Sequence, residues 1–258
     1  MTTRRYFLEL GYNGLRYSGF QRQQNANSIQ AEVEKAFATL QREPVEMTGS
    51  SRTDTGVHAL QNFFHFDYAG LIHPQFVYKM NAVLPPDIVV RNLYPVAPAA
   101  HARFDALSRE YRYFVYQQKN PFLHDRAYYH PYRVDLNVLQ EAAGLIRTYH
   151  DFSAFAKRNS QVKTHQCTIY ASEWKEQADC LVYTVRANRF LRGMVRGLTG
   201  TMLLAGRGKI TLQELRTIIE LKDNRNADFS VPGWGLFLAG VEYPEGALLT
   251  SGLQSAFR

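Results

Sequence analysis

The order of strand-like and helical segments predicts an α+β protein made of two related halves, each an antiparallel sheet with helices on one face. Three observations support this class. Strand and helix patterns alternate along the chain without low-complexity linkers, and the same alternation returns in the second half. The glycine fingerprint of a doubly wound parallel sheet is missing. A sheet with helices on one face leaves its other face free for a ligand.

The first half, residues 1–104, is expected to begin with a strand. Arg5–Tyr12 is rich in aromatic and aliphatic residues and ends at the turn dipeptide Asn13-Gly14. A helix capped by Asn27 or Ser28 is expected to run to Leu40, because its apolar residues recur at helical spacing. The remaining elements of this half are a short strand at Val45–Met47, an alternating strand at Asn62–Tyr68, and a helix at Pro74–Leu84 that Pro85 and Pro86 end.

The second half, residues 105–258, repeats this arrangement. Its strands are expected at Arg109–Gln117, Gln166–Trp174, Cys180–Ala187 and Leu236–Val241, and its helices at Asp135–Ile146, Phe190–Ala205 and Leu212–Leu221. We therefore expect two domains. The N-terminal half carries the loop around Asp54, and the C-terminal half carries a tyrosine-rich strand and an arginine-bearing helix.

The composition is that of an ordinary globular protein with a basic excess. Of 258 residues, 45% are hydrophobic and 21% are charged, which allows a sizeable core and argues against disorder. The net charge is +7, and residues 105–258 hold +5 of it, with 20 Lys and Arg against 15 Asp and Glu. This excess is compatible with a polyanionic partner such as nucleic acid.

Several classes of protein are disfavoured by what the sequence lacks. Cys167 and Cys180 are too few and too far apart for a disulfide framework or a four-ligand zinc site, which favours a reducing, cytoplasmic setting. The N-terminus has no long apolar stretch, and no later run has the length of a membrane span. Walker, His-Glu-x-x-His and Gly-x-Ser-x-Gly patterns are missing, so metal, nucleotide and serine-nucleophile mechanisms lose support.

One carboxylate stands out by its surroundings. Asp54 lies in Gly49–Ala59, a segment rich in Gly and Ser, between Arg52 and His58. From these residues alone, an Asx turn that holds Thr55-Gly56 explains Asp54 more readily than catalysis does. His58, likewise, is more often a packed or hydrogen-bonded histidine than a general base.

A basic segment follows later in the chain. Residues 186–209 contain six basic side chains and no acidic one. If this segment is helical, Arg189, Arg192 and Arg196 lie within about 60° of one another at 100° per residue. Such a face is either a solvated basic surface or a set of phosphate contacts.

The strand Arg109–Tyr116 is rich in aromatic residues. Alternation places Tyr111, Tyr113 and Val115 on one of its faces. These side chains either pack in a core or form a platform on which an unstacked base can lie.

Several stretches together resemble one family. Gly49–Ala59 resembles the Gly-Arg-Thr-Asp-x-Gly-Val-His signature of the TruA family of tRNA pseudouridine synthases. Further blocks match in order: Tyr12–Gln23, Ala82–Ile88 with His101–Phe104, Arg109–Tyr113, Phe190–Arg196 and Gly235–Pro244. The resemblance covers nearly the whole chain. The chain departs from the family pattern at Ser51 (usually glycine), Thr55 (commonly alanine) and Phe20 (frequently tryptophan), and none of these changes removes a reacting group.

The resemblance implies roles for particular residues. Asp54 would be the catalytic aspartate, Tyr111 the tyrosine that lies against the target uracil, and Arg196 the arginine paired with the aspartate. Substrate-binding roles fall to Leu236, which would bracket the base, to Arg52, which would enter the RNA stack, and to His58, Arg189, Arg192 and Arg22.

The resemblance also implies a fold, a substrate and an assembly. Two ferredoxin-like (RRM-like) halves would share a continuous, mainly antiparallel sheet with helices on one face, and the active site would lie in the cleft between them. The enzyme would isomerise uridines at tRNA positions 38–40 without cofactor or metal, as a homodimer that grips tRNA across both subunits. Two questions stay open: whether the aspartate attacks C6 or assists at the sugar, and whether Tyr111 is a base or a stacking partner.

Two other interpretations account for parts of the sequence. A non-catalytic RNA-binding module would use the aromatic and basic residues and would need Asp54 only as a turn residue. A nucleoside glycosidase would release the base to water and would need a second carboxylate, for which Glu110 and Asp105 are the candidates. Neither acid lies at a matching catalytic position, whereas Asp54, Tyr111 and Arg196 are all present. The synthase is therefore favoured.

Overall fold

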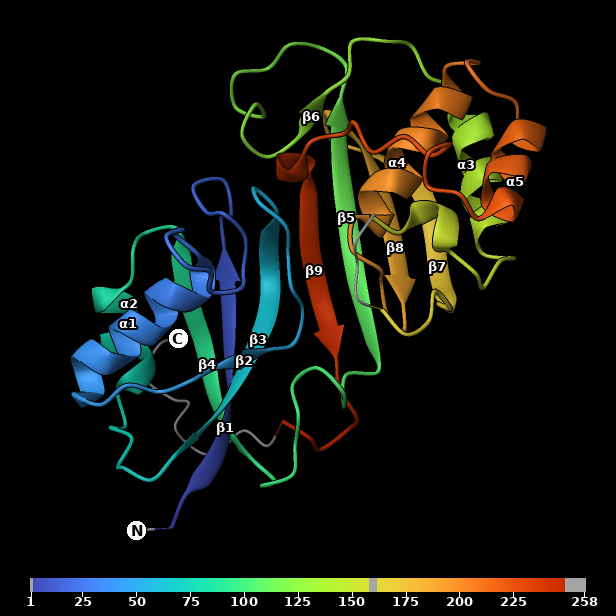
Figure 1. Ribbon diagram of the computed structural model, residues 1–258. Helices are drawn as coiled ribbons and strands as arrows, with labels where there is room; N and C mark the ends of the chain where they lie inside the picture. The colour runs from blue at the N-terminus through green and yellow to red at the C-terminus, as the bar shows by residue number, and fades with distance from the viewer. Residues whose placement is uncertain (1, 158–161, 249–258) are drawn as a thin grey trace. The chain divides into compact units, whose positions relative to one another are not determined.

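The computed structural model describes residues 2–157 and 162–248 as a mixed α+β structure. Among these residues there are five α-helices, and the strands pair mainly antiparallel (Figure 1). The chain forms two compact units, one from the residues up to 107 together with those from 238 on, and one from residues 108–237. The α+β class is confirmed. The ferredoxin-like character of the halves, their continuous sheet and the domain division at residues 104/105 stay predictions.

The first unit is built on three long strands. Its elements are β1 (Arg4–Tyr12), α1 (Ile29–Gln41), β2 (Thr48–Gly49), β3 (His58–Tyr68), α2 (Phe76–Val83), β4 (Ile88–Val96) and most of β9 (Leu236–Glu242). β1 lies between β3 and β4 and is antiparallel to both, and β2 pairs with β3. Figure 1 shows α1 and α2 next to each other beside these strands.

The helix side of this sheet is an aromatic core. Phe64, Phe66 and Tyr68 alternate along β3 and share this side. Phe37 of α1 lies edge-on against Phe66 and Tyr68, with ring centroids 5.2 Å away in both pairs. Phe20, from the loop before α1, stacks on Phe64 at 4.6 Å. The loop before α1 is thereby tied to the core of the sheet.

The opposite side of the sheet is covered by other segments of the same unit. Tyr243 packs edge-on against Phe7 and Phe63. His65 is also buried there, and its Nδ1 accepts a hydrogen bond from the backbone N–H of Ala102 at 3.3 Å. The centre of this sheet is thus buried on both sides. The helix-free face that the sequence suggests is therefore not open to a ligand at these described positions.

The covered face carries a titratable group, His65. Burial lowers the pKa of His65 to about 4. The His101 ring, whose centroid is 4.4 Å away, and the Arg5 guanidinium lower this pKa further, whereas Asp67 and Asp105 oppose them. The imidazole is therefore neutral at neutral pH, which is the form that can accept a backbone hydrogen bond.

We expect the depressed pKa of His65 to make folding stability depend on pH. The unfolded chain takes up a proton near pH 6.5 and the folded chain only near pH 4, so stability is full above pH 6.5 and falls between these values. The loss approaches about 3 kcal/mol at pH 4, at 1.36 kcal/mol per pKa unit. His65→Asn keeps a side-chain acceptor and removes the titration. Urea unfolding at pH 7.5 and pH 5 should show that the unfolding free energy decreases less in this variant than in the wild type.

The exposed residue His124 provides the control for this prediction. His124→Asn should show the same decrease in unfolding free energy between pH 7.5 and pH 5 as the wild type. Equal decreases in the wild type and in His65→Asn would show that His65 does not couple folding to pH.

The second unit has its own antiparallel sheet. Its elements are β5 (Ser108–Tyr116), β6 (Tyr128–Tyr129), α3 (Leu136–Ile146), η1 (Ser153–Phe155), β7 (Ile169–Gln177), β8 (Cys180–Ala187), α4 (Met194–Gly206), α5 (Leu212–Leu221) and η2 (Gly233–Gly235). β8 lies between β5 and β7 and is antiparallel to both, and β6 adds to β5 in parallel. In Figure 1, α3, α4 and α5 form a group beside this sheet.

The core of this unit centres on Trp174. Its ring stacks on Tyr183 of the neighbouring strand, with centroids 5.2 Å apart, and its indole N–H points at the sulfur of Met202 on α4. Gln140 of α3 donates a side-chain hydrogen bond to the backbone carbonyl of Trp174. Tyr113 of β5 is fully buried as well. The odd-numbered side of β5, which includes Tyr111, therefore faces the helices.

Two strands of the first unit differ from the sequence expectation. β4 is not among the expected elements; it contains Pro95, and proline cannot donate to a central ladder. The structure tolerates Pro95 because β4 is the edge strand beside β1. The expectation of a strand at Val45–Met47 is wrong, because pairing with β3 begins only at Thr48. Ser28 is confirmed as the cap of α1, since its hydroxyl accepts from the N–H of Ala31.

The helix expected at Phe190–Ala205 begins later than predicted. α4 starts at Met194, after Gly193, whose φ of 74° lies in the left-handed region. Arg189 and Arg192 therefore precede the helix, and only Arg196 lies on it. The prediction of a single helix face bearing all three arginines is wrong.

Candidate active site

The loop between β2 and β3 alternates between buried and outward side chains around Asp54. Ser51 and Thr53 are buried, Arg52 is exposed and Asp54 is half-buried. Asp54 also opens a turn, because its carbonyl accepts a hydrogen bond from the N–H of Val57 at 3.1 Å. A turn at Asp54 is confirmed, whereas its side-chain hydrogen bond, which would make it an Asx turn, stays a prediction. The alternation presents the arginine and the carboxylate away from the buried side of the loop.

Buried polar groups of β1, β3 and the loop before α1 hold this loop by hydrogen bonds. The hydroxyls of Tyr12 and Thr53 share a hydrogen bond of 2.8 Å. The side-chain amide of Asn62 donates to the Tyr12 hydroxyl at 3.2 Å and to the carbonyl of Ser51 at 2.9 Å. The N–H of Phe20 donates to the carbonyl of Thr53 at 3.1 Å. Both residues that flank Arg52 are thereby tied to β1, to β3 and to the loop before α1.

His58 is the first residue of β3 and is buried, with 1% of its surface exposed. Its Nδ1 accepts a hydrogen bond from the backbone N–H of Gly14 at 3.1 Å. Gly14 lies so close to this segment that a Cβ on it would be 2.0 Å from the carbonyl oxygen of Val57. His58 thus links the turn after β1 to the Asp54 loop, and its role in substrate binding stays a prediction.

Arg22 lies beside a polar cavity of about 550 Å³ lined by Gln21, Arg22, Gln30, Glu34, Pro44, Val45 and Glu46. Its backbone N–H donates to Gln30 Oε1 at 3.0 Å, and its Nη1 is 3.4 Å from Glu34 Oε2. The Arg22 side chain is 71% exposed. A long ion pair at an exposed site contributes little to stability. The Arg22 guanidinium is therefore free to reorient toward an anion.

Tyr111 lies on β5 on the side that faces the helices. It is opposite Val185 of β8 and is 9% exposed. Its ring packs edge-on against Phe190, with centroids 5.0 Å apart. The position gives the phenol a fixed aromatic neighbour on the segment that leads into α4.

Arg196 and Tyr113 together fix the segment that leads to Leu236. Arg196 donates from Nε to the carbonyl of Val231 at 2.8 Å and from Nη2 to that of Phe229 at 3.3 Å. The Tyr113 hydroxyl donates to the carbonyl of Pro232 at 2.7 Å. Leu236 follows after η2, with 6% of its surface exposed. Nη1 of Arg196 makes no hydrogen bond with the residues that the structure describes, so the guanidinium keeps capacity for an anion.

Two more arginines lie on the segment before α4. Arg189 is half-buried, and its charge opposes the rise in pKa that burial causes at Cys167. Arg192 is exposed, and its carbonyl accepts from the N–H of Lys157. Their roles in substrate binding stay predictions.

The site residues expected from the sequence divide between the two units. The first unit holds Asp54, Arg52, His58 and Arg22, and the second holds Tyr111, Arg196, Leu236, Arg189 and Arg192. The ion pair between Asp54 and Arg196 therefore stays a prediction. Sequence reasoning missed the supporting residues Tyr12, Asn62 and Tyr113. They share the alternating pattern of ordinary core positions, and only the pairing register of the strands reveals their contacts.

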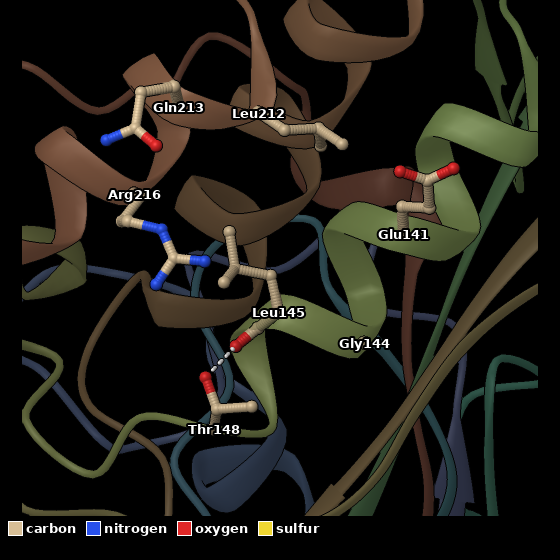
Figure 2. A pocket seen from close by; sticks show the side chains of 7 residues that line it. All are labelled: Glu141, Gly144, Leu145, Thr148, Leu212, Gln213 and Arg216. Carbon is tan, nitrogen blue, oxygen red and sulfur yellow. Dashed lines mark hydrogen bonds between the residues drawn. The ribbon is translucent and has the colours of Figure 1, made fainter.

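A second cavity, between α3 and α5, is unrelated to these residues. It has a volume of about 300 Å³ and is lined by Glu141, Gly144, Leu145, Thr148, Leu212, Gln213 and Arg216. Figure 2 shows the Arg216 and Gln213 side chains extending from α5 and Glu141 from α3. None of the expected site residues lines it, so it is not the candidate active site.

Residues 2–157 and 162–248 lack two further features. No cluster of three or more His, Cys, Asp or Glu side chains there could hold a metal ion. No helix in this part of the chain is long and apolar enough to cross a membrane.

The chain is similar to known proteins along almost its whole length. A model of the tRNA pseudouridine synthase family matches residues 11–105 and 149–244, which include Asp54, Arg196 and Leu236, while Tyr111 lies between the two ranges. The chain is 46% identical over 244 residues to tRNA pseudouridine synthase A of Parabacteroides distasonis, covering 94% of this chain and 97% of that protein. It is 38% identical to the protein of the same name from Bacillus subtilis, over 91% of this chain and 97% of that protein. It is 35% identical to that from Staphylococcus aureus, over 95% of this chain and 94% of that protein.

Proposed function

The chain belongs to the tRNA pseudouridine synthase family, and from this premise we propose that it modifies uridines at positions 38–40, in the anticodon stem-loop, with Asp54 as the catalytic residue. Membership makes it an enzyme, an isomerase that acts on tRNA. The observation that carries the role of Asp54 is the construction of its loop. Buried hydrogen bonds hold Ser51 and Thr53, while Arg52 and Asp54 are directed away from the buried side.

The reaction requires a carboxylate but no change of oxidation state. The bond from N1 of uracil to C1′ of the ribose breaks, the base turns, and a bond from C5 to C1′ forms. The proton lost from C5 is balanced by one gained at N1, so no cofactor is needed. The Asp54 carboxylate either attacks C6 of the ring or stabilises the oxocarbenium character that develops at the sugar.

Residues of the second unit supply the opposing charge, the aromatic ring and the apolar side chain that the reaction at Asp54 needs. A pocket dry enough for uracil disfavours a bare carboxylate, and Arg196 offers an opposing charge from a guanidinium whose Nε and Nη2 are already fixed. Tyr111 offers a ring against the base and a hydroxyl that can take or relay the C5 proton. Leu236 brackets the base and helps to exclude water, which would otherwise capture the sugar intermediate.

RNA binding completes the proposal. Extruding a base from its stack costs a few kcal/mol, which stacking and phosphate contacts repay. We assign Arg52 to the gap in the RNA stack, and Arg22, Arg189, Arg192 and His58 to binding of the surrounding RNA. A homodimer that grips one tRNA across both subunits, in the cytoplasm, is part of the same proposal.

Tritium release tests this function. Unmodified tRNA transcripts are labelled with tritium at C5 of uridine, and parallel transcripts retain a single uridine at position 38, 39 or 40. We expect release from each single-uridine transcript and none from a transcript that has no uridine at these positions. Release accompanied by free uracil and an abasic site would indicate a glycosidase. Tight tRNA binding without tritium release would indicate a binding module.

We expect Tyr12→Phe to slow the reaction without weakening tRNA binding. The change removes the hydroxyl that bonds Thr53 and accepts from Asn62, so the Asp54 loop loses the buried hydrogen bond that holds Thr53 in place. A lost hydrogen bond of about 1–1.5 kcal/mol corresponds to roughly a tenfold decrease in kcat, with KM unchanged. Single-turnover kinetics at saturating enzyme measures this step.

Tyr94→Phe is the matched control for Tyr12→Phe. It removes a tyrosine hydrogen bond of 2.8 Å to Glu9 on the other face of the same sheet. The unfolding free energy of Tyr94→Phe should fall by at least as much as that of Tyr12→Phe, whereas kcat should equal that of the wild type. Similar kcat values for the two variants would show that the Tyr12 hydroxyl supports only the fold.

A further inference from the structure

An aromatic and basic surface lies in the second unit where β6, the segment before α3 and the C-terminal end of α4 meet. We call it the Tyr132 surface and define it by Tyr129, Tyr132, Arg133, Arg207 and Lys209, all exposed or half-exposed. Three hydrogen bonds assemble it. Gln117 Nε2 donates to the carbonyl of Tyr132 at 2.7 Å, the N–H of His130 to that of Tyr116 at 2.9 Å, and the N–H of Asp135 to that of Gly206 at 2.8 Å.

An arginine is already stacked on this surface. The guanidinium carbon of Arg207 is 3.6 Å from the centroid of the Tyr132 ring, which is 50% exposed. Such a contact holds the guanidinium flat, with its N–H edges available to phosphate or base edges. Tyr129, 41% exposed on β6, adds a second open ring. Flat cations and open aromatic rings are the groups on which unpaired bases stack.

The three cations of this surface, Arg133, Arg207 and Lys209, are not paired with a carboxylate among the described residues. Asp228, whose charge acts on the His130 ring, accepts from the N–H of Ser230. The nearby carboxylate of Asp135 is committed to capping α3, where it accepts from the N–H groups of Asn137 and Val138. Phosphate groups would therefore meet three cations whose charge is not already paired.

A buried histidine under the surface has unused hydrogen-bonding groups. His130 is 4% exposed, and neither of its ring nitrogens has a hydrogen-bond partner among the described residues. Its ring lies between Tyr128 and Tyr132, with centroids 5.5 and 5.2 Å away. Burial, and then the charge of Arg207, lower the pKa of His130, so the ring offers one donor and one acceptor at neutral pH. An unsatisfied polar group of this kind is costly unless a ligand uses it.

The Tyr132 surface is separate from the residues expected to hold uracil. Arg196 lies in the first turn of α4 and Arg207 directly follows its last residue. Eleven residues of helix at 1.5 Å per residue separate them by roughly 16 Å. A nucleotide held at Arg196 therefore does not also reach Tyr132.

We propose that the Tyr132 surface is a second RNA-binding site, which stacks an unpaired base of the tRNA against Arg207 and Tyr129 and takes flanking phosphates on Arg133 and Lys209. This inference rests on the proposed function, because it takes tRNA as the substrate. The segment bound here lies outside the stem-loop that carries the target uridine. The surface therefore adds affinity for the whole tRNA and leaves the chemical step unchanged.

Arg207→Gln and Tyr132→Leu test the proposal, with Arg216→Gln as the control. Arg216 is a cation on α5 that lines the cavity between α3 and α5 and is not part of the Tyr132 surface (Figure 2), and its loss changes the net charge by the same amount as Arg207→Gln. Dissociation constants are measured for full-length tRNA and for an isolated anticodon stem-loop at several salt concentrations. Circular dichroism melting confirms that each variant folds, and Arg207→Gln replaces only a surface side chain.

We expect both test variants to bind full-length tRNA about 5- to 100-fold more weakly, which is the range for one lost stacking contact. Arg207→Gln should also reduce the salt slope by about one. Binding of the stem-loop, and kcat at saturating tRNA, should match those of Arg216→Gln. Full-length binding equal to the control, or an equal loss on the stem-loop, would overturn the proposal.

The outcomes separate this inference from the proposed function. A wild type that binds tRNA but releases no tritium would defeat the proposed activity, while the comparison of the variants in tRNA binding would still decide the role of the surface. A wild type that releases tritium with unchanged binding in both variants would defeat only the second site.

Discussion

Asp54→Asn is expected to lower tritium release from C5-labelled tRNA by at least about 10³-fold, within the range for a single positioned acid or base. Asparagine has nearly the same shape, so the turn from Asp54 to Val57, which uses backbone atoms, should persist. The amide cannot ionise. It can neither attack C6 nor stabilise positive charge at the sugar, so both routes stop at the first step. Single-turnover assays measure the loss.

The control for this variant is Asp125→Asn, another half-buried aspartate, which pairs with Arg126 in the second unit. It should keep wild-type activity. Both variants should bind tRNA as the wild type does, because neither removes a basic or stacking group. If Asp54→Asn kept more than about a tenth of the activity, Asp54 would be only a turn residue and another carboxylate would have to be sought.

The Asp54 loop illustrates how far the sequence reaches. Its bounding glycine and serine residues predict a turn, and the turn is present. The sequence does not reveal that Thr53 bonds Tyr12 or that Ser51 bonds Asn62. These contacts depend on the register of β1 against β3, which places Tyr12 opposite Ala59 after a bulge. Registers are set by pairing over the whole sheet, and a local pattern does not contain them.

The fold shows the same division between local and distant determinants. Elements with a clear period and a cap, such as α1 and α5, are predicted to within about two residues. β4 is absent from the sequence expectation, and its Pro95 is acceptable only because β4 is an edge strand, a position in the sheet that is a tertiary property. The start of α4 is misplaced because Gly193 takes a left-handed conformation, whereas its apolar neighbours continue the helical period. Extending the helical period back through Arg192 and Arg189 created the apparent three-arginine face.

Gly14→Ala is expected to damage both the fold and the activity. The added Cβ would be 2.0 Å from the carbonyl oxygen and 2.7 Å from the carbonyl carbon of Val57, and backbone atoms cannot rotate away as a side chain can. Overpacking of this kind costs about 1–3 kcal/mol, and we expect the upper end of that range. Val57 must move, and its N–H closes the turn at Asp54. A displacement of about 1 Å at a catalytic group lowers kcat by about 10²-fold.

Gly144→Ala makes the same chemical change where there is room for it. Gly144 lies in α3, and a Cβ there would meet no atom within 4 Å apart from the backbone of its own helix. Alanine should raise the unfolding free energy by about 0.5–1 kcal/mol, because glycine loses more backbone freedom on entering a helix, and kcat should not change. Urea unfolding and single-turnover kinetics of the two variants therefore separate the effect of a methyl group from the effect of its position. Wild-type kinetics in Gly14→Ala would show that the turn after β1 does not position Asp54.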